Sequence, residues 1–152
     1  MIHLNIGSNL KSKYGTKFDN ISIAVSLLIK SKFRIKKISS FYETPSYPNK
    51  SLPKYANIGL SGQYELSYLN LMKKISLIEK KIGRIKTLKN MPRVCDIDII
   101  DFNGEIIKND KLVVPHPRLH LRNFVIYPLK EIEPNWSHPI LSLIHISEPT
   151  RP

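Results

Sequence analysis

The segment at residues 91–102 constrains the fold of this chain more than any other stretch. Pro92 interrupts regular structure, and the residues after it are rich in valine, isoleucine and phenylalanine, so residues 94–102 predict a β-strand. Because successive side chains of a strand point to opposite faces, Asp96 and Asp98 share one face, with their Cα atoms roughly 6.5–7 Å apart. A largely apolar strand therefore carries two adjacent carboxylates.

These two carboxylates need a partner. Burying like charges side by side is costly unless a cation or an arginine neutralises them. Oxygen-only ligands suit Mg²⁺, which completes its shell with water and substrate phosphates. Asp96 and Asp98 are therefore candidate ligands for one or two divalent cations. The alternative is an edge strand whose polar face is solvated.

The charge balance favours an anionic partner. The chain of 152 residues has 24 Lys and Arg against 12 Asp and Glu, a net charge of +12. Such a charge suits binding of a nucleotide, a nucleic acid or an anionic membrane surface. The chain has no glycine-rich phosphate loop, so phosphates would be held by side chains and metal. The candidates are Arg84, Lys86, Lys89 and Arg93 before the strand, and Lys111, His116, Arg118 and Arg122 after it. For any one of them alone, a solvated surface charge is the simpler interpretation.

The single cysteine and the absence of long apolar runs narrow the class of protein. One cysteine excludes an intramolecular disulfide, and Cys95 is predicted to be a small buried hydrophobe. The sequence shows no signal peptide, and its longest apolar run, at residues 24–29, is too short to span a bilayer. We therefore expect a cytoplasmic protein.

The order of the expected elements predicts the fold class. Strands are expected at residues 2–6, 33–43, 55–65 and 94–102, a turn at 7–9, a loop at 44–53, and helices that begin after Thr16 and Ser67, the second ending at Gly83. Residues 104–138 are expected to hold short strands and a loop. This order, βαββαβ, is the ferredoxin-like α+β pattern, in which two helices pack on one face of an antiparallel sheet.

A series of short motifs resembles the 6-hydroxymethyl-7,8-dihydropterin pyrophosphokinase family of folate biosynthesis. The motifs keep the order and spacing of the family over nearly the whole chain. They are Gly7-Ser8-Asn9-Leu10, Ser39-Ser40-Phe41-Tyr42-Glu43-Thr44-Pro45, Tyr55-Ala56-Asn57, Glu79, Gly83-Arg84, Pro92-Arg93-Val94-Cys95-Asp96-Ile97-Asp98, Val114-Pro115-His116-Pro117-Arg118, Arg122-Asn123-Phe124-Val125 and Pro128-Leu129. The family is similar in fold, with a ferredoxin-like core.

The resemblance implies transfer of the β,γ-diphosphate of ATP to the hydroxymethyl oxygen of a reduced pterin, with release of AMP. By position, Asp96 and Asp98 would bind two Mg²⁺ ions, and Arg84 and Arg93 would contact the phosphates as catalytic residues. The implied ATP-binding residues are Glu79, Lys86, Ile99, Lys111, His116, Arg118 and Arg122. Between Gly83 and Arg93 the chain is shorter than better-known relatives and offers lysines where they have a tryptophan and a second arginine.

The implied pterin-binding residues are Thr44, Pro45, Tyr55, Asn57 and Phe124. A flat, polar heterocycle needs aromatic faces to stack on and amide groups that match its edge. Tyr55, Phe124 and Asn57 supply those types. The alternative for the two aromatic residues is ordinary core packing.

The resemblance also bears on the extent of the domain. We expect a single pyrophosphokinase domain at residues 1–140. Residues 141–152 do not resemble the closing helix of the family and look like a translated sequencing adapter, so we interpret them as an atypical, non-native tail.

Two other functions compete with this interpretation. A ferredoxin-like sheet with a charge of +12 could be an RNA-binding module, although the expected aromatic segment is missing and two aspartates would repel phosphate. An inactive scaffold of the same fold is the other alternative. On the main interpretation the partners are ATP and the pterin, with neither nucleic acid nor membrane, and the protein is a monomer.

Overall fold

The computed structural model describes residues 1–46, 49–85, 92–115 and 122–138. Its elements in chain order are β1 (Ile2–Ser8), α1 (Lys17–Lys30), β2 (Arg34–Ile38), β3 (Tyr42–Thr44), β4 (Tyr55–Gln63), α2 (Tyr68–Ile82), β5 (Asp96–Phe102), β6 (Ile107–Lys108), β7 (Val113–Val114) and α3 (Asn123–Ile132). The residues predicted to form the tail lie outside the described part.

The main sheet is antiparallel, with strand order β2-β4-β1-β5, and β3 also pairs with β4. This confirms the α+β class and the expected order of elements. The strand expected at residues 33–43 is divided into β2 and β3, which both pair with β4. At the break, the hydroxyl of Ser39 accepts the main-chain N–H of Gly59 at 2.9 Å. A side chain thus replaces a main-chain partner where the strand is interrupted.

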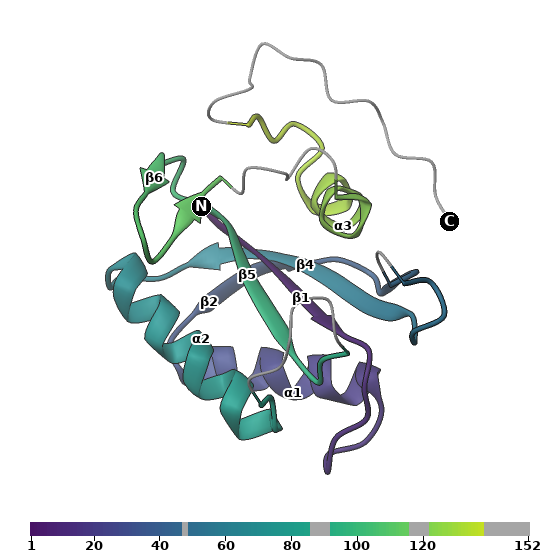
Figure 1. Ribbon diagram of the computed structural model, residues 1–152. Helices are drawn as coiled ribbons and strands as arrows, with labels where there is room; N and C mark the ends of the chain where they lie inside the picture. The colour runs from purple at the N-terminus through teal and green to yellow at the C-terminus, as the bar shows by residue number, and fades with distance from the viewer. Residues whose placement is uncertain (47–48, 86–91, 116–121, 139–152) are drawn as a thin grey trace.

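The two expected helices cover one face of the sheet, as Figure 1 shows. Helix α1 begins at the predicted capping box, in which Thr16 and Asp19 satisfy each other's main-chain N–H groups, and α2 is capped by Ser67. Gly83 ends α2 at a φ of 120°, a conformation that glycine adopts without steric cost. The main core, which includes Ile6, lies between these helices and the sheet.

Helix α3 packs on the opposite face of the sheet (Figure 1), and the sequence analysis did not anticipate it. Only short strands and a loop were expected after residue 104. The strands exist as β6 and β7, but Pro128 within the helix hid its apolar spacing. Val125 and Leu129, one turn apart, pack with Ile100 of β5 in a second, smaller core.

Strands β1 and β5 differ from their expected bounds at the end of the sheet that matters for function. Strand β1 continues to Ser8 instead of turning at Gly7, because Gly7 pairs with Asn57 on one side and with Asp96 on the other. Strand β5 begins at Asp96, two residues later than expected.

Within the described residues, no helix has the length and apolar character that would be needed to cross a membrane.

Candidate active site

The two aspartates lie on the face of the sheet that carries α3. Ile97 and Ile99, which alternate with them along β5, are buried in the core beneath α1 and α2. Asp96 and Asp98 therefore share the other face, as the alternation of a strand predicts. The sheet register aligns Asp96 with Gly7 and Asn57, and aligns Asp98 with Asn5 and Gly59.

Two arginines neutralise Asp96. The Nη1 atom of Arg84 lies 3.1 Å from one carboxylate oxygen of Asp96, and Nη1 of Arg93 lies 3.4 Å from the other. These are the arginines that the sequence assigned to phosphate. Burial acts to lower the pKa of Arg84, but Glu79 and Asp96 raise it overall, so its charge is secure. Both guanidinium groups are partly exposed and thus accessible to an anionic ligand.

Glu79 organises this cluster from α2. One of its carboxylate oxygens, Oε2, accepts from Arg84 at 2.7 Å and from the main-chain N–H of Ile97 at 2.9 Å. Strand β5 stands at the end of the strand order, so that N–H faces outward and would otherwise lack a sheet partner. Burial raises the pKa of Glu79 against the opposing effect of these two contacts. In this structure Glu79 thus orients Arg84, a role that its sequence position alone does not reveal.

Asp98 is a crowded carboxylate beside Asp96. Burial, and then the charge of Asp96, raise the pKa of Asp98 to about 7, while Arg122 and Arg93 act in the opposite direction. A carboxylate that is crowded in this way gains from a bound cation. The donors fit Mg²⁺, because both are carboxylate oxygens.

The protein alone does not complete a metal shell here. Among the residues that the structure describes, no group of three or more His, Cys, Asp or Glu side chains is arranged to hold a metal ion. Asp96 and Asp98 would supply the protein ligands, and the remaining positions would fall to water and to the phosphates of a substrate.

Asn9 connects the arginine cluster to the neighbouring loop, and the sequence analysis did not select it. Its Oδ1 atom accepts the main-chain N–H of Arg93 at 2.7 Å, and its own N–H donates to the carbonyl of Arg93 at 3.0 Å. Its Nδ2 donates to Ser46 and to the carbonyl of Pro53. The Gly-Ser-Asn motif at the end of β1 was the available signal, but only the fold shows which groups Asn9 binds.

The predicted pterin residues lie beside the aspartates. Asn57, which is buried, donates from Nδ2 to the hydroxyl of Thr44 at 3.0 Å. Gly7 separates Asn57 from Asp96 without a side chain, and a Cβ there would stand 2.8 Å from Oδ1 of Asn57. Tyr55 is half-buried. Burial raises its pKa, while the charge of Arg93 lowers it and that of Asp96 raises it. The Cδ1 atom of Tyr55 would stand 3.5 Å from a Cβ on Gly7, so the ring lies beside Gly7.

Phe124 enters the site from the first turn of α3. Its ring is partly buried, and the guanidinium carbon of Arg122 lies 5.5 Å from the ring centroid, a cation–π contact. Pro45 is exposed next to Thr44. The predicted stacking residues thus come from β4 and from α3.

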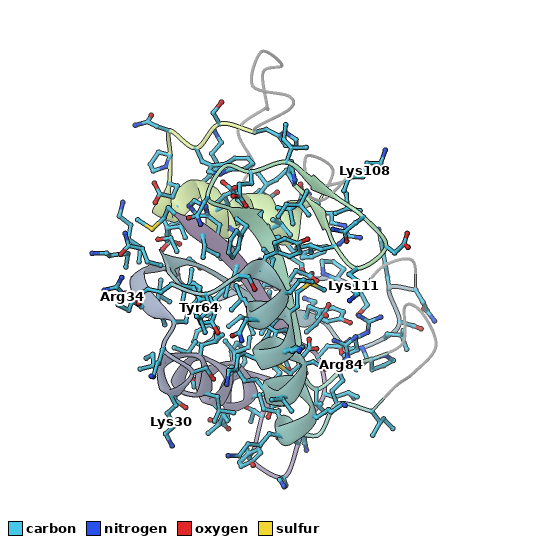
Figure 2. The ribbon with its side chains drawn as sticks, turned by 90° about the vertical axis from the view of Figure 1, so that its left-hand side faces the viewer. Lys30, Arg34, Tyr64, Arg84, Lys108 and Lys111 are labelled. Atoms are coloured by element: carbon cyan, nitrogen blue, oxygen red, sulfur yellow. The ribbon has the colours of Figure 1, made fainter. Side chains whose placement is uncertain are left out.

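The structure brings most of the predicted residues together, but not all of them. Ile99 turns its side chain into the core, so only its main chain could meet a ligand. Lys111 is exposed in the turn between β6 and β7. Figure 2 shows Lys111 and Arg84 on the same side of α2, to its right in that view. Lys86, Lys89, His116 and Arg118 lie outside the described residues.

Known proteins match this chain over most of its length. The model of the family described as 7,8-dihydro-6-hydroxymethylpterin-pyrophosphokinase (HPPK) matches residues 3–134. The chain is 40% identical over 143 residues to the folic acid synthesis protein FOL1 of Dictyostelium discoideum, covering 94% of this chain and 21% of that protein. It is 37% identical to the 2-amino-4-hydroxy-6-hydroxymethyldihydropteridine pyrophosphokinase of Aquifex aeolicus, covering 91% of this chain and 84% of that protein.

A solved structure supports the fold. A crystal structure of an HPPK-DHPS in complex with substrates superposes with a TM-score of 0.59 at 15% identity, covering 90% of this chain and 40% of that one. The chain thus spans a minor part of the longer relatives and most of the Aquifex aeolicus protein. On the extent of the family match, this chain belongs to the 7,8-dihydro-6-hydroxymethylpterin-pyrophosphokinase family.

Proposed function

We propose that this chain transfers the β,γ-diphosphate of ATP to the hydroxymethyl oxygen of 6-hydroxymethyl-7,8-dihydropterin and releases AMP. The reaction class, that of a pyrophosphokinase in folate biosynthesis, follows from membership of the family. One observation carries the proposal. A carboxylate pair, two arginines and a row of aromatic and amide side chains suited to a pterin lie together on one face of the sheet.

The nucleotide side of this surface is assigned to the charged cluster. Arg84 and Arg93 contact Asp96. Phosphate oxygens offer these guanidinium groups stronger bidentate partners, so we expect both to turn toward the β- and γ-phosphates when ATP binds. Two bound Mg²⁺ ions would supply charge neutralisation between the phosphates and the carboxylates of Asp96 and Asp98. Arg122, at the start of α3, adds a third positive charge.

The pterin side is assigned to the row that runs from Thr44 and Asn57 toward the aspartates. Tyr55 and Phe124 are both incompletely buried, so each has ring surface left for stacking. The amide of Asn57 has one Nδ2 hydrogen engaged by Thr44, which fixes the orientation of Oδ1 toward Gly7. Pro45 limits the outer end of this row. A pterin bound here would hold its hydroxymethyl group near Asp96.

Several further assignments complete the proposal. Lys86, Lys111, His116, Arg118 and the main chain of Ile99 would contact ATP around this cluster. We propose two Mg²⁺ ions per site, a single domain over residues 1–140, and a monomer located in the cytoplasm.

The test of this function is the identity of the nucleotide product. The purified chain is incubated with MgATP and 6-hydroxymethyl-7,8-dihydropterin, and the nucleotides are separated by chromatography. We expect AMP, formed only with the pterin and abolished by EDTA. Formation of ADP, or of AMP without the pterin, would contradict the proposal.

A further inference from the structure

We propose that Asn5 is a positioning residue for the pterin, because its side-chain amide holds the first turn of α3 and, through that turn, the ring of Phe124. The inference rests on the proposed function, since the position of this ring matters only if the surface binds a pterin. The side-chain amide of Asn5 donates to the main-chain carbonyl of Phe124.

The hydrogen bond from Asn5 satisfies a carbonyl that the sequence of α3 leaves without a helical donor. In a regular α-helix, the carbonyl of Phe124 would accept the N–H of the residue four positions later. That residue is Pro128, which has no N–H. The Nδ2 atom of Asn5 donates to the oxygen of Phe124 at 2.9 Å and so replaces the missing helical donor. Without Asn5, a carbonyl at the active-site end of α3 would lose this partner.

The position of Asn5 in the sheet makes this contact rigid. Asn5 is 3% exposed and lies in register between Gly59 of β4 and Asp98 of β5. Gly59 allows the same helix to approach closely, since a Cβ on it would stand 2.9 Å from Cβ of Pro128. Two paired residues of the sheet therefore position α3. Gly59 leaves room for Pro128, and the amide of Asn5 binds the carbonyl of Phe124.

The consequence for the site follows from what else the first turn of α3 carries. The ring of Phe124 is attached to the residue whose carbonyl Asn5 holds. Arg122 lies over that ring, with its guanidinium carbon 5.5 Å from the centroid. When the turn shifts, the stacking surface shifts relative to Tyr55 and Asn57 across the site, so pterin affinity should fall more than ATP affinity.

A compensating substitution separates this role from general packing. Pro128→Ala keeps a Cβ against Gly59 and provides a main-chain N–H that can donate to the carbonyl of Phe124. Asn5→Ala, Pro128→Ala and the double variant are compared with the wild type by calorimetric titration of 6-hydroxymethyl-7,8-dihydropterin and of MgATP, and by the rate of AMP formation. Ile21→Val, on the buried face of α1, controls for loss of stability.

We expect Asn5→Ala to weaken pterin binding about five- to tenfold, as the loss of one buried hydrogen bond implies. MgATP binding should change less than about twofold, and the double variant should recover most of the pterin affinity. Ile21→Val should lower the melting temperature and leave both affinities unchanged. The inference would be overturned if Asn5→Ala lowered pterin affinity by the same factor in the wild type and in the Pro128→Ala background. It would also be overturned if Asn5→Ala left pterin affinity unchanged. A wild-type chain that binds no pterin would instead overturn the proposed function.

Discussion

The carboxylate of Glu79 on α2 accepts the main-chain N–H of Ile97 on β5 at 2.9 Å and contacts Arg84 at 2.7 Å with the same oxygen. One side chain thus satisfies an outward main-chain N–H of the edge strand β5 and orients an arginine that we assign to phosphate.

Removing the Glu79 carboxylate should therefore affect stability and turnover together. We expect Glu79→Ala to lower the free energy of unfolding by about 2 kcal/mol, because a buried N–H loses its acceptor. The same change should lower kcat/KM for MgATP by about tenfold or more, since Arg84 loses its orientation. Urea unfolding and steady-state kinetics measure the two effects. As a control, Glu65→Ala removes an exposed ion pair with Arg34 and should change stability by less than about 0.5 kcal/mol. Normal kinetics in Glu79→Ala would contradict this role.

The carboxylate pair should be needed for chemistry and not for folding. We expect Asp96→Asn and Asp98→Asn each to reduce the rate of AMP formation by about 1,000-fold or more, because each removes a charged metal ligand from the transition state. Circular dichroism should show a folded protein in both cases. Turnover near the wild-type rate in either variant, measured over a range of Mg²⁺ concentrations, would exclude the two-metal assignment.

The raised pKa of Asp98 predicts how stability depends on pH without metal. Burial, followed by the charge of Asp96, raises this pKa from 3.8 in the unfolded reference to about 7. The folded state therefore binds the proton more tightly, and the stability that the protonated group contributes is lost as the pH rises toward and past 7. We expect the metal-free protein to lose ~2 kcal/mol of unfolding free energy between pH 5 and 8.

The variant Asp98→Asn isolates that dependence. It should be more stable than the wild type at pH 8 and nearly equal to it at pH 4, as measured by urea unfolding in EDTA. Added Mg²⁺ should stabilise the wild type at pH 8 and have little effect on the variant. Parallel pH profiles for the two proteins would contradict the assignment.

Gly7 should be needed for pterin binding. A Cβ at this position would stand 2.8 Å from Oδ1 of Asn57 and 3.5 Å from Cδ1 of Tyr55, so Gly7→Ala must displace the Asn57 amide. We expect the KM for the pterin to rise about tenfold, while the KM for MgATP changes little. Gly104→Asn, in a turn with open space and a φ of 72°, is the matched control, because asparagine tolerates that conformation. Equal kinetics for Gly7→Ala and the wild type would show that this row does not bind the pterin.

Cys95 should be inert in the folded protein. It is fully buried, and burial, followed by the charges of Glu79 and Asp96, raises the pKa of its thiol. We expect Ellman's reagent at pH 8 to react about 100-fold or more slowly with the folded protein than with the protein in guanidinium chloride. The sequence has one cysteine, so the absorbance change reports this thiol alone. Rapid reaction without denaturant would contradict the burial of Cys95, which directly precedes β5.

Local patterns in the sequence were sufficient to predict the parts of the fold that depend on neighbours along the chain. The capping box at Thr16, the glycine that ends α2 and the alternation that places Asp96 beside Asp98 are all such patterns. Helix α3 was missed because Pro128 argues against a helix unless another residue satisfies the carbonyl of Phe124. That residue is Asn5, 119 positions away in the chain.

In the candidate site, too, some features were predictable from the local sequence and others depend on distant parts of the chain. Asp96, Asp98, Arg84 and Arg93 were selected from residue type and order, and the structure brings them into contact or onto one face. The partners of Asn9, and the two contacts of Glu79, depend on the register of β1 against β5 and on the position of α2. These relationships are set by tertiary packing, which no short motif encodes.

An extra residue in β5 has a different kind of consequence. The register of β5 against β1 shifts between His3 and Leu4, so that Leu4 pairs with Ile99, His3 pairs with Asp101, and Ile100 is the extra residue. Before the shift Ile97 and Ile99 enter the main core, and after it Phe102 does. Asp101 is thereby kept on the other face, where it accepts a hydrogen bond from Nε1 of Trp136 at 2.8 Å.

Because of this shift, two successive residues of β5, Ile100 and Asp101, lie on the face of the sheet that carries α3. A lineage that lost Ile100 would return β5 to regular alternation, with Asp101 still on the face of α3 and Phe102 still in the main core. Val125 and Leu129, however, would lose the strand residue against which they pack. Selection should therefore allow isoleucine to be exchanged for valine along β5, and should act against the loss of Ile100, because that loss leaves a gap beneath α3.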